Sequence, residues 1–307
     1  MTVRSRQSRS PLSRPRRWLR LAGALCGVAL LASTRAFAGS TVYAAGDIAE
    51  CNGPASDSDA AHTAALIPSA ATVLVLGDSA YPSADRATLA ACYDPTWGRF
   101  RAHTYAVAGN HDYVNGSPRD FLSYFGAPTP HRTWFRVAIG DWWVIGLDSD
   151  LRGSQLARQQ AWLARQLAEI EGDGRCLLAM WHHALFSTGL HKGDGEPMRA
   201  SWRLLDAAGA DVVLSGHEHY YESFDPLDAD GKPQADGIRE FIVGTGGAGL
   251  RDLSLSSRHR AYAHVFGVLE LQLEADRYQY AFHTVDGGVG DRGEARCRRP
   301  LRAVSRH

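Results

Sequence analysis

The chain has 307 residues, and its 33 basic residues equal its 33 acidic residues in number. Eight of the basic residues are arginines within the first 38 positions, so residues 39–307 carry 25 basic and 33 acidic residues, a net charge of −8 (25 − 33). An acidic body argues against nucleic acid as the main partner, because binding to a phosphate backbone needs a basic surface. It allows a small anionic ligand, since bound metal cations would dominate the local field.

The first 38 residues are organised like an export signal. The arginine-rich start precedes an apolar run from Leu21 to Ala32, and Ala36-Phe37-Ala38 supplies a small-x-small cleavage site. The run is too short to cross a bilayer, so we expect export, cleavage near Ala38 and no stable membrane anchor. Arg16-Arg17 resembles a twin-arginine signal. An ordinary secretory signal is the alternative, because Arg20 occupies a position where an apolar residue would be expected.

Residues 39–307 are expected to form a single domain, since they are enough for one substantial core and contain no repeat or linker. Six short apolar runs predict buried strands. They are 41–45, 72–76, 104–108, 176–181, 211–214 and 241–243. Helical patterns lie at 57–66, 156–170 and 197–208, and antiparallel pairs are expected for 133–138 with 142–147 and for 265–273 with 278–284. Alternating strands and helices imply an α/β fold of two facing mixed β-sheets flanked by helices.

Four cysteines follow the signal, at Cys51, Cys92, Cys176 and Cys297. An even number in an exported chain is compatible with two disulfides, although three pairings are possible. Cys51 and Cys92 come just after two strands expected to be neighbours, which favours a Cys51–Cys92 bond and leaves Cys176–Cys297 by elimination. A cysteine metal site is disfavoured, because the chain has no C-x-x-C spacing.

Polar residues follow five of the predicted strands, directly after each apolar run. In chain order these endings are Gly46-Asp47, Gly77-Asp78, Gly109-Asn110-His111-Asp112, His182-His183 and Ser215-Gly216-His217-Glu218-His219. The carboxyl ends of parallel strands share one edge of a sheet, so we expect these side chains to converge there. His217 and His219 would both face the site, because residues two apart in an extended segment point the same way. Imidazole with carboxylate suits zinc, iron or manganese, and the set is large enough for two ions.

These blocks resemble those of the calcineurin-like metallophosphoesterases and, within them, the purple acid phosphatases. The family's blocks are G-D, G-D-x-x-Y, G-N-H-D/E, a strand ending in His, and G-H-x-H, and they match this chain between residues 46 and 219. Tyr81, in Gly77-Asp78-Ser79-Ala80-Tyr81, narrows the resemblance to the purple acid phosphatases. The resemblance implies an αββα sandwich and a metal-dependent hydrolase of small phosphoric esters.

The resemblance also implies a set of ligands for two metal ions. Asp47, Tyr81 and His219 would hold the first ion, Asp78 would bridge, and Asn110, His182 and His217 would hold the second. A tyrosinate ligand favours Fe(III) at the first position, with Fe(II), Zn or Mn at the second. Two alternatives stay open: Tyr81 is a packed aromatic beside the site, or His183 replaces His182 because Ala184 departs from the family's usual block.

Further residues are implied for catalysis and substrate contact. His111 would contact phosphate and protonate the leaving oxygen, and Asp112 would orient its imidazole. Asn110, His183 and Tyr221 are expected to contact the substrate as well. His131, Trp134, Asp150 and His191 are weaker candidates for shaping substrate choice. The loop 244–249 matches G-x-G-x-x-G, but no helix pattern follows it, so we interpret it as backbone support near the metals rather than a dinucleotide site.

The resulting hypothesis is an exported phosphomonoesterase in which a metal-bound hydroxide attacks phosphorus in line. One alternative is a phosphodiesterase or nucleotide hydrolase of the same fold, which would differ in the width and lining of its pocket. The other is a catalytically silent metal- or phosphate-binding exported protein. Loss of a ligand or of His111 would favour that second alternative, and the sequence retains them all.

Overall fold

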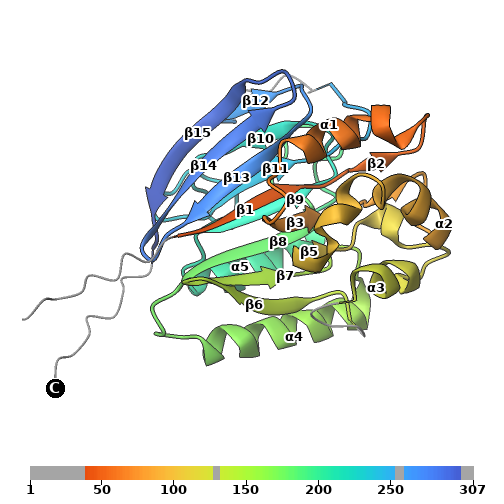
Figure 1. Ribbon diagram of the computed structural model, residues 1–307. Coiled ribbons are helices and arrows are strands. Elements are labelled where there is room, and N and C mark those ends of the chain that lie inside the picture. Colours follow the sequence, from red (N-terminus) through yellow and green to blue (C-terminus); the bar gives the residue numbers. More distant parts are fainter. Residues whose placement is uncertain (1–38, 127–131, 253–258, 299–307) are drawn as a thin grey trace, which may run out of the picture. The chain divides into compact units, whose positions relative to one another are not determined.

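Two β-sheets organise this computed structural model, which describes residues 39–126, 132–252 and 259–298 (Figure 1). The first sheet has the strand order β15-β14-β13-β1-β3-β5, and the second has the order β12-β10-β11-β9-β8-β7-β6. The first consists of β1 (Ser40–Ala45), β3 (Thr72–Leu76), β5 (Thr104–Val107), β13 (Gly267–Leu273), β14 (Arg277–Thr284) and β15 (Val289–Arg296). The second consists of β6 (Phe135–Ile139), β7 (Trp142–Gly146), β8 (Cys176–His183), β9 (Val212–Gly216), β10 (Tyr221–Ser223), β11 (Arg239–Val243) and β12 (Ala261–Ala263).

Each sheet contains a group of parallel strands. β1, β3 and β5 are parallel neighbours in the first sheet, as are β7, β8, β9 and β11 in the second. An antiparallel strand adjoins each group, β13 beside β1 and β6 beside β7. The predicted α/β fold of two mixed sheets is therefore confirmed, including the two antiparallel pairs. The carboxyl ends of the parallel strands carry the polar blocks found in the sequence.

Helices pack on the outer faces of the sheets (Figure 1). On the second sheet, Leu163 and Leu167 of α4 (Gly153–Glu169) and Trp202 of α5 (Arg199–Ala207) belong to one buried cluster with Leu177 and Trp181 of β8. The first sheet is covered by α1 (Asp59–Ala65), α2 (Arg86–Thr88) and α3 (Arg119–Phe125), with the short turns η1 (Ala55–Asp57), η2 (Leu89–Tyr93) and η3 (Trp97–His103). A short β2–β4 pair (Ala49–Glu50 with Ala80–Tyr81) follows β1 and β3.

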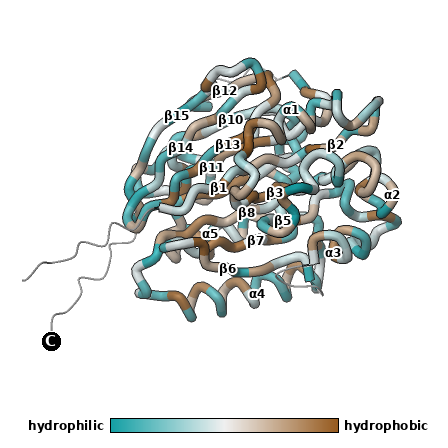
Figure 2. The backbone as a smooth tube through the Cα atoms, in the orientation of Figure 1, coloured by the Kyte–Doolittle hydropathy of each residue, from teal (hydrophilic) through white to brown (hydrophobic). Residues whose placement is uncertain are grey.

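A second apolar cluster joins the two sheets. It contains Val42 and Leu74 of the first sheet together with Leu178 and Leu214 of the second, all fully buried. The parallel strands are accordingly hydrophobic along their length, whereas β15 is mostly hydrophilic (Figure 2). Strand β15 escaped sequence prediction for this reason: it is an edge strand whose residues are all exposed or half-buried, so it has no apolar pattern.

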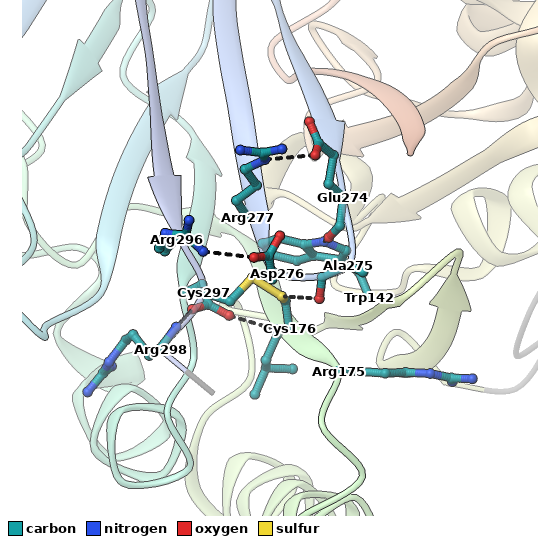
Figure 3. Close-up of a disulfide and its surroundings, with 12 residues drawn as sticks. Trp142, Arg175, Cys176, Glu274, Ala275, Asp276, Arg277, Arg296, Cys297 and Arg298 are labelled. Atoms are coloured by element: carbon teal, nitrogen blue, oxygen red, sulfur yellow. Dashed lines mark hydrogen bonds and ion pairs between the residues drawn. A yellow bond between two sulfur atoms is a disulfide. The ribbon is translucent and has the colours of Figure 1, made fainter. Parts of the chain in front are cut away.

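Both predicted disulfides are present, with Cα–Cα distances of 5.6 Å for Cys51–Cys92 and 5.7 Å for Cys176–Cys297. The second joins the start of β8 to the residue after β15, and so links the two sheets (Figure 3). Nearby, Arg296 Nη1 lies 2.8 Å from Asp276 Oδ2. Asp211 lies close to the two sulfurs, but oxidised cysteines offer no thiolate to a metal. In the described part of the chain, no helix has the length and apolarity needed to cross a bilayer.

Candidate metal centre

The strand ends that carry the polar blocks turn through an unusual backbone conformation. Asp47 after β1, Asp78 after β3 and His217 after β9 have φ angles of 58°, 52° and 71°. Among the described residues only one other non-glycine residue, Asn115, has positive φ. Non-glycine residues in this region are strained, and such strain concentrates at functional sites. The turns bring three side chains from separate strands to one edge, as the parallel pairing predicts.

The Tyr81 hydroxyl lies at the centre of one group of side chains. Its Oη is 2.7 Å from Asp47 Oδ1, 2.8 Å from Asp78 Oδ2 and 3.1 Å from His219 Nε2. His219 Nδ1 donates to the Gly249 carbonyl at 2.7 Å, so a neutral imidazole directs its Nε2 lone pair into the group. A single hydroxyl proton therefore faces two carboxylate oxygens and one imidazole nitrogen. A cation surrounded by these four atoms would satisfy all of them.

Burial and the charges in this group shift the pKa values of its members. Burial and the Asp47 and Asp78 carboxylates raise the pKa of Tyr81 well above its usual value. Burial alone would raise the pKa of Asp47, but the neighbouring His219 and His182 lower it. Burial alone would lower the pKa of His219, but the Asp47 carboxylate raises it. Hydrogen bonds between acids and bases thus connect the members of this group.

A second group shares Asp78 with the first. Asp78 Oδ2 lies 3.3 Å from His182 Nε2, which in turn lies 3.3 Å from His217 Nδ1. His182 Nδ1 donates to the Leu76 carbonyl at 2.8 Å, which orients its Nε2 toward Asp78. Burial alone would lower the pKa of His182, but the Asp78 carboxylate, with Asp47, raises it to about 10. The two groups are therefore adjacent, with one carboxylate oxygen common to both.

Asn110 supplies an unpaired oxygen. Its Oδ1 is buried and has no hydrogen-bond partner among the described residues. A buried carbonyl oxygen without a partner costs free energy unless an ion or water satisfies it. Carboxylate, amide, phenol and imidazole donors in two groups that share a carboxylate fit two metal ions. The seven predicted ligands, Asp47, Asp78, Tyr81, Asn110, His182, His217 and His219, all lie on this edge of the sheets.

His111 lies at the edge of the centre. Its side chain is 32% exposed, its Nε2 is 4.0 Å from Asp78 Oδ2, and its ring centroid is 4.4 Å from that of Tyr81. Its Nδ1 donates to the Pro82 carbonyl at 2.7 Å, which leaves Nε2 on the side of the carboxylate. His111 is thus placed to touch a molecule bound at the centre.

Asp112 does not orient His111, contrary to the expectation from the sequence. It is fully buried, and its carboxylate accepts hydrogen bonds from the backbone N–H groups of Gly109 and Asp78, each at 2.8 Å, and of Ser79 at 3.2 Å. Burial and the Asp78 charge raise its pKa to about 7. Asp112 therefore fixes the two loops that carry Asp78 and Asn110, while a backbone carbonyl orients His111.

The other residues predicted to contact the substrate do not all lie at the centre. His183 is buried beside the second group, and ring nitrogens of His182, His183 and His217 all lie within 4.8 Å of one another. Its Nδ1 is 2.8 Å from Ser149 Oγ, and its ring centroid is 4.3 Å from that of His217. Tyr221 is not brought to the centre. Its ring stacks on Phe282 between the sheets, and its hydroxyl donates to Asp291 at 2.9 Å. β10 begins at this residue, so Tyr221 belongs to the second sheet rather than to the loop at the centre. His131 lies outside the described residues.

The glycine-rich loop supports the centre as expected. Ala248 N donates to the Asp47 carbonyl at 2.9 Å, and the Gly249 carbonyl accepts from His219. Asp194 was missed in the sequence, although its Oδ2 lies 3.1 Å from His217 Nε2. It belongs to the loop between β8 and α5, where no motif marks it. The same loop carries His191, whose ring centroid is 4.7 Å from that of His217.

Comparison with known proteins agrees with this geometry. The sequence model of the calcineurin-like phosphoesterase family matches residues 40–221. Among curated proteins, purple acid phosphatase 18 of Arabidopsis thaliana is 24% identical over 139 residues, 44% of this chain and 32% of that protein. The Mycobacterium tuberculosis protein Rv2577 is 27% identical over 146 residues, 39% of this chain and 28% of that protein. The chain thus spans about a third or less of the length of these relatives.

Solved structures share the fold at low sequence identity. Purple acid phosphatase PPD1 from yellow lupin superposes with a TM-score of 0.64 and 18% identity, covering 83% of this chain and 53% of that one. GAP50 of Plasmodium superposes with a TM-score of 0.68 and 14% identity, covering 86% and 90%. The family match covers more than half of the chain and contains every predicted metal ligand. The chain therefore belongs to the calcineurin-like phosphoesterase family.

Proposed function

We propose that this protein is an exported phosphomonoesterase that uses two metal ions held by the seven predicted ligands. The observation that carries the proposal is the pair of donor groups that share Asp78 Oδ2, with the Tyr81 hydroxyl within 3.1 Å of three other candidate ligand atoms. Family membership and the similarity to purple acid phosphatases support the same reaction class.

The residues around the centre have separate tasks in this mechanism. Two bound cations would supply a water of lowered pKa and positive charge against the phosphoryl oxygens. His111, fixed through Nδ1 by the Pro82 carbonyl, would in its protonated form present Nε2–H to the leaving oxygen. Asp112 keeps the Asp78 and Asn110 loops in place through its backbone contacts. The Leu76 and Gly249 carbonyls hold His182 and His219 in the tautomer that turns Nε2 toward the centre.

The metals and the compartment are part of the proposal. Tyr81, with two carboxylates beside it, suits Fe(III) at the first position, and the imidazole-rich second position suits Fe(II), Zn or Mn. Two disulfides suit an oxidising compartment, which fits the export signal expected in residues 1–38, outside the described residues.

Steady-state hydrolysis of p-nitrophenyl phosphate and of bis-p-nitrophenyl phosphate tests the reaction. The proposal predicts that kcat/KM for the monoester exceeds that for the diester, and that chelation abolishes both activities. A visible absorption band that disappears in Tyr81→Phe would identify a tyrosinate on iron. Preference for the diester would instead identify a phosphodiesterase on the same scaffold.

A further inference from the structure

Arg251 occupies a fixed position beside the proposed metal ligands. Its backbone N–H donates to the His219 carbonyl at 3.0 Å, and two residues earlier the Gly249 carbonyl accepts from His219 Nδ1 at 2.7 Å. The turn 249–251 is therefore tied to His219 at two points. The backbone of Arg251 is therefore held in place by His219, one of the proposed metal ligands.

The Arg251 guanidinium is directed toward the His217 side of the centre. Its Nη1 lies 3.0 Å from Nδ1 of His191, whose ring packs against that of His217. The same Nη1 lies 3.4 Å from Nε2 of that ring, so the guanidinium, which can only donate, is directed at the His191 imidazole. Both residues are partly exposed, so the guanidinium lies at the surface beside His217 rather than in the core.

The positive charge of Arg251 has no direct acidic partner in the described ranges, where no carboxylate lies within ion-pair distance of it. The nearby Glu218 is 2% exposed and is engaged elsewhere: it accepts from Ser187 Oγ at 2.5 Å and from the His191 backbone N–H at 3.1 Å. Its Oε2 lies 3.7 Å from His191 Nδ1. The carboxylate thus braces the loop that carries His191 and leaves the guanidinium available to an anion.

The side chains of Arg251 and His111 lie beside different groups of the centre. His111 packs on Tyr81 and the first group, whereas Arg251 reaches the second group through His191 and His217. His111 and Arg251 are both partly exposed, so a phosphate ester bound at the centre would carry its leaving group toward solvent on the side where these two side chains lie. A second anionic group on that leaving group would meet Arg251 there.

We infer that Arg251 forms an anion subsite that selects substrates carrying a second phosphate directly attached to the scissile one, such as nucleoside diphosphates, over simple monoesters. This inference rests on the proposed phosphatase function. A guanidinium binds phosphate oxygens through two parallel hydrogen bonds, which a lysine cannot reproduce in full. The subsite therefore distinguishes substrates with a second phosphate from simple monoesters by the extra negative charge and by the geometry of the second phosphate.

The test compares AMP with ADP, which differ by the phosphate that Arg251 would bind. In the metal-loaded protein we expect Arg251→Gln to lower kcat/KM for ADP by about tenfold to a hundredfold more than for AMP, the size of one or two hydrogen bonds to a charged group. Arg251→Lys should retain part of the preference. Arg292→Gln, an exposed arginine on β15, is the matched control and should change neither value.

Binding of the non-hydrolysable α,β-methylene analogue of ADP gives a second readout, and its Kd should rise in Arg251→Gln but not in Arg292→Gln. Equal losses for both nucleotides would show that Arg251 only positions His191, and no loss would show that it contacts neither, so both results overturn the inference. Failure of the wild-type protein to hydrolyse AMP, ADP and p-nitrophenyl phosphate would instead overturn the proposed function.

Discussion

The Nε2 atom of His182 lies 3.3 Å from the Nδ1 atom of His217, although the two residues come from different strands. The other ring nitrogen of each is engaged, that of His182 by the Leu76 carbonyl and that of His217 by Asp194. Two imidazole nitrogens that face each other in this way need a proton or a cation between them. The raised pKa of His182 supplies a proton there, and with the Asp78 carboxylate 3.3 Å from His182 Nε2 the same nitrogens suit a metal ion.

Asp194 is expected to strengthen metal binding through His217. Its carboxylate accepts from His217 Nε2, which fixes the ring and makes Nδ1 a better ligand. Asp194→Ala should weaken binding of the second metal by about 10- to 100-fold, measured by competition with a chromophoric chelator. Lys192→Ala, an exposed change in the same loop, is the control. Equal metal affinity in Asp194→Ala and wild type would remove this role.

His111 should affect catalysis without affecting metal content. Its Nε2 is near Asp78 but its Nδ1 is held by a backbone carbonyl, so it supports the reaction rather than the metals. Loss of a positioned acid lowers kcat by about 10²- to 10⁴-fold, which we expect for His111→Asn with p-nitrophenyl phosphate. Elemental analysis should give the wild-type metal content. A drop in metal content that matched the loss of activity would instead make His111 a ligand.

Asp112 should matter for stability. Asp112→Asn replaces one acceptor oxygen by an amide donor in front of backbone N–H groups, in a fully buried position. A buried unsatisfied group costs about 1–3 kcal/mol, so the free energy of unfolding in urea should fall by that amount. Asp236→Asn, an exposed aspartate, should change it by less than about 0.5 kcal/mol. If both variants unfold like the wild type, the carboxylate does not brace the loops.

Glu240 predicts how stability depends on pH. Burial raises its pKa from 4.5 to about 8, despite hydrogen bonds from the backbone N–H groups of Phe186 and Leu185 and from Ser215. Between these values the folded state binds more protons than the unfolded state, so stability falls as pH rises, by up to about 1.4 kcal/mol per pH unit. Urea unfolding from pH 5 to 8 in EDTA should show a shallower fall for Glu240→Gln. Parallel curves would contradict this assignment.

The strand ends were predictable because apolar runs that end in Gly-Asp or Gly-His mark the carboxyl edge of a parallel sheet. The direction in which individual side chains point could not be predicted from the sequence. Asp112 and His111 are neighbours on one short turn (η4, Asn110–Asp112) yet point to opposite sides, and Tyr221 turns inward where β10 begins. Asp194 could not be found because no motif marks its loop, and Arg251 could not because it follows the glycine-rich loop 244–249 outside the matched pattern.

Metal content per chain is the most direct test of the two-metal centre. Elemental analysis of the purified protein should give about two ions per chain, and Asp78→Asn should lose most of both, because Asp78 Oδ2 belongs to both donor groups. A wild-type protein that holds no stoichiometric metal, and takes up none from iron, zinc or manganese salts, would contradict the account.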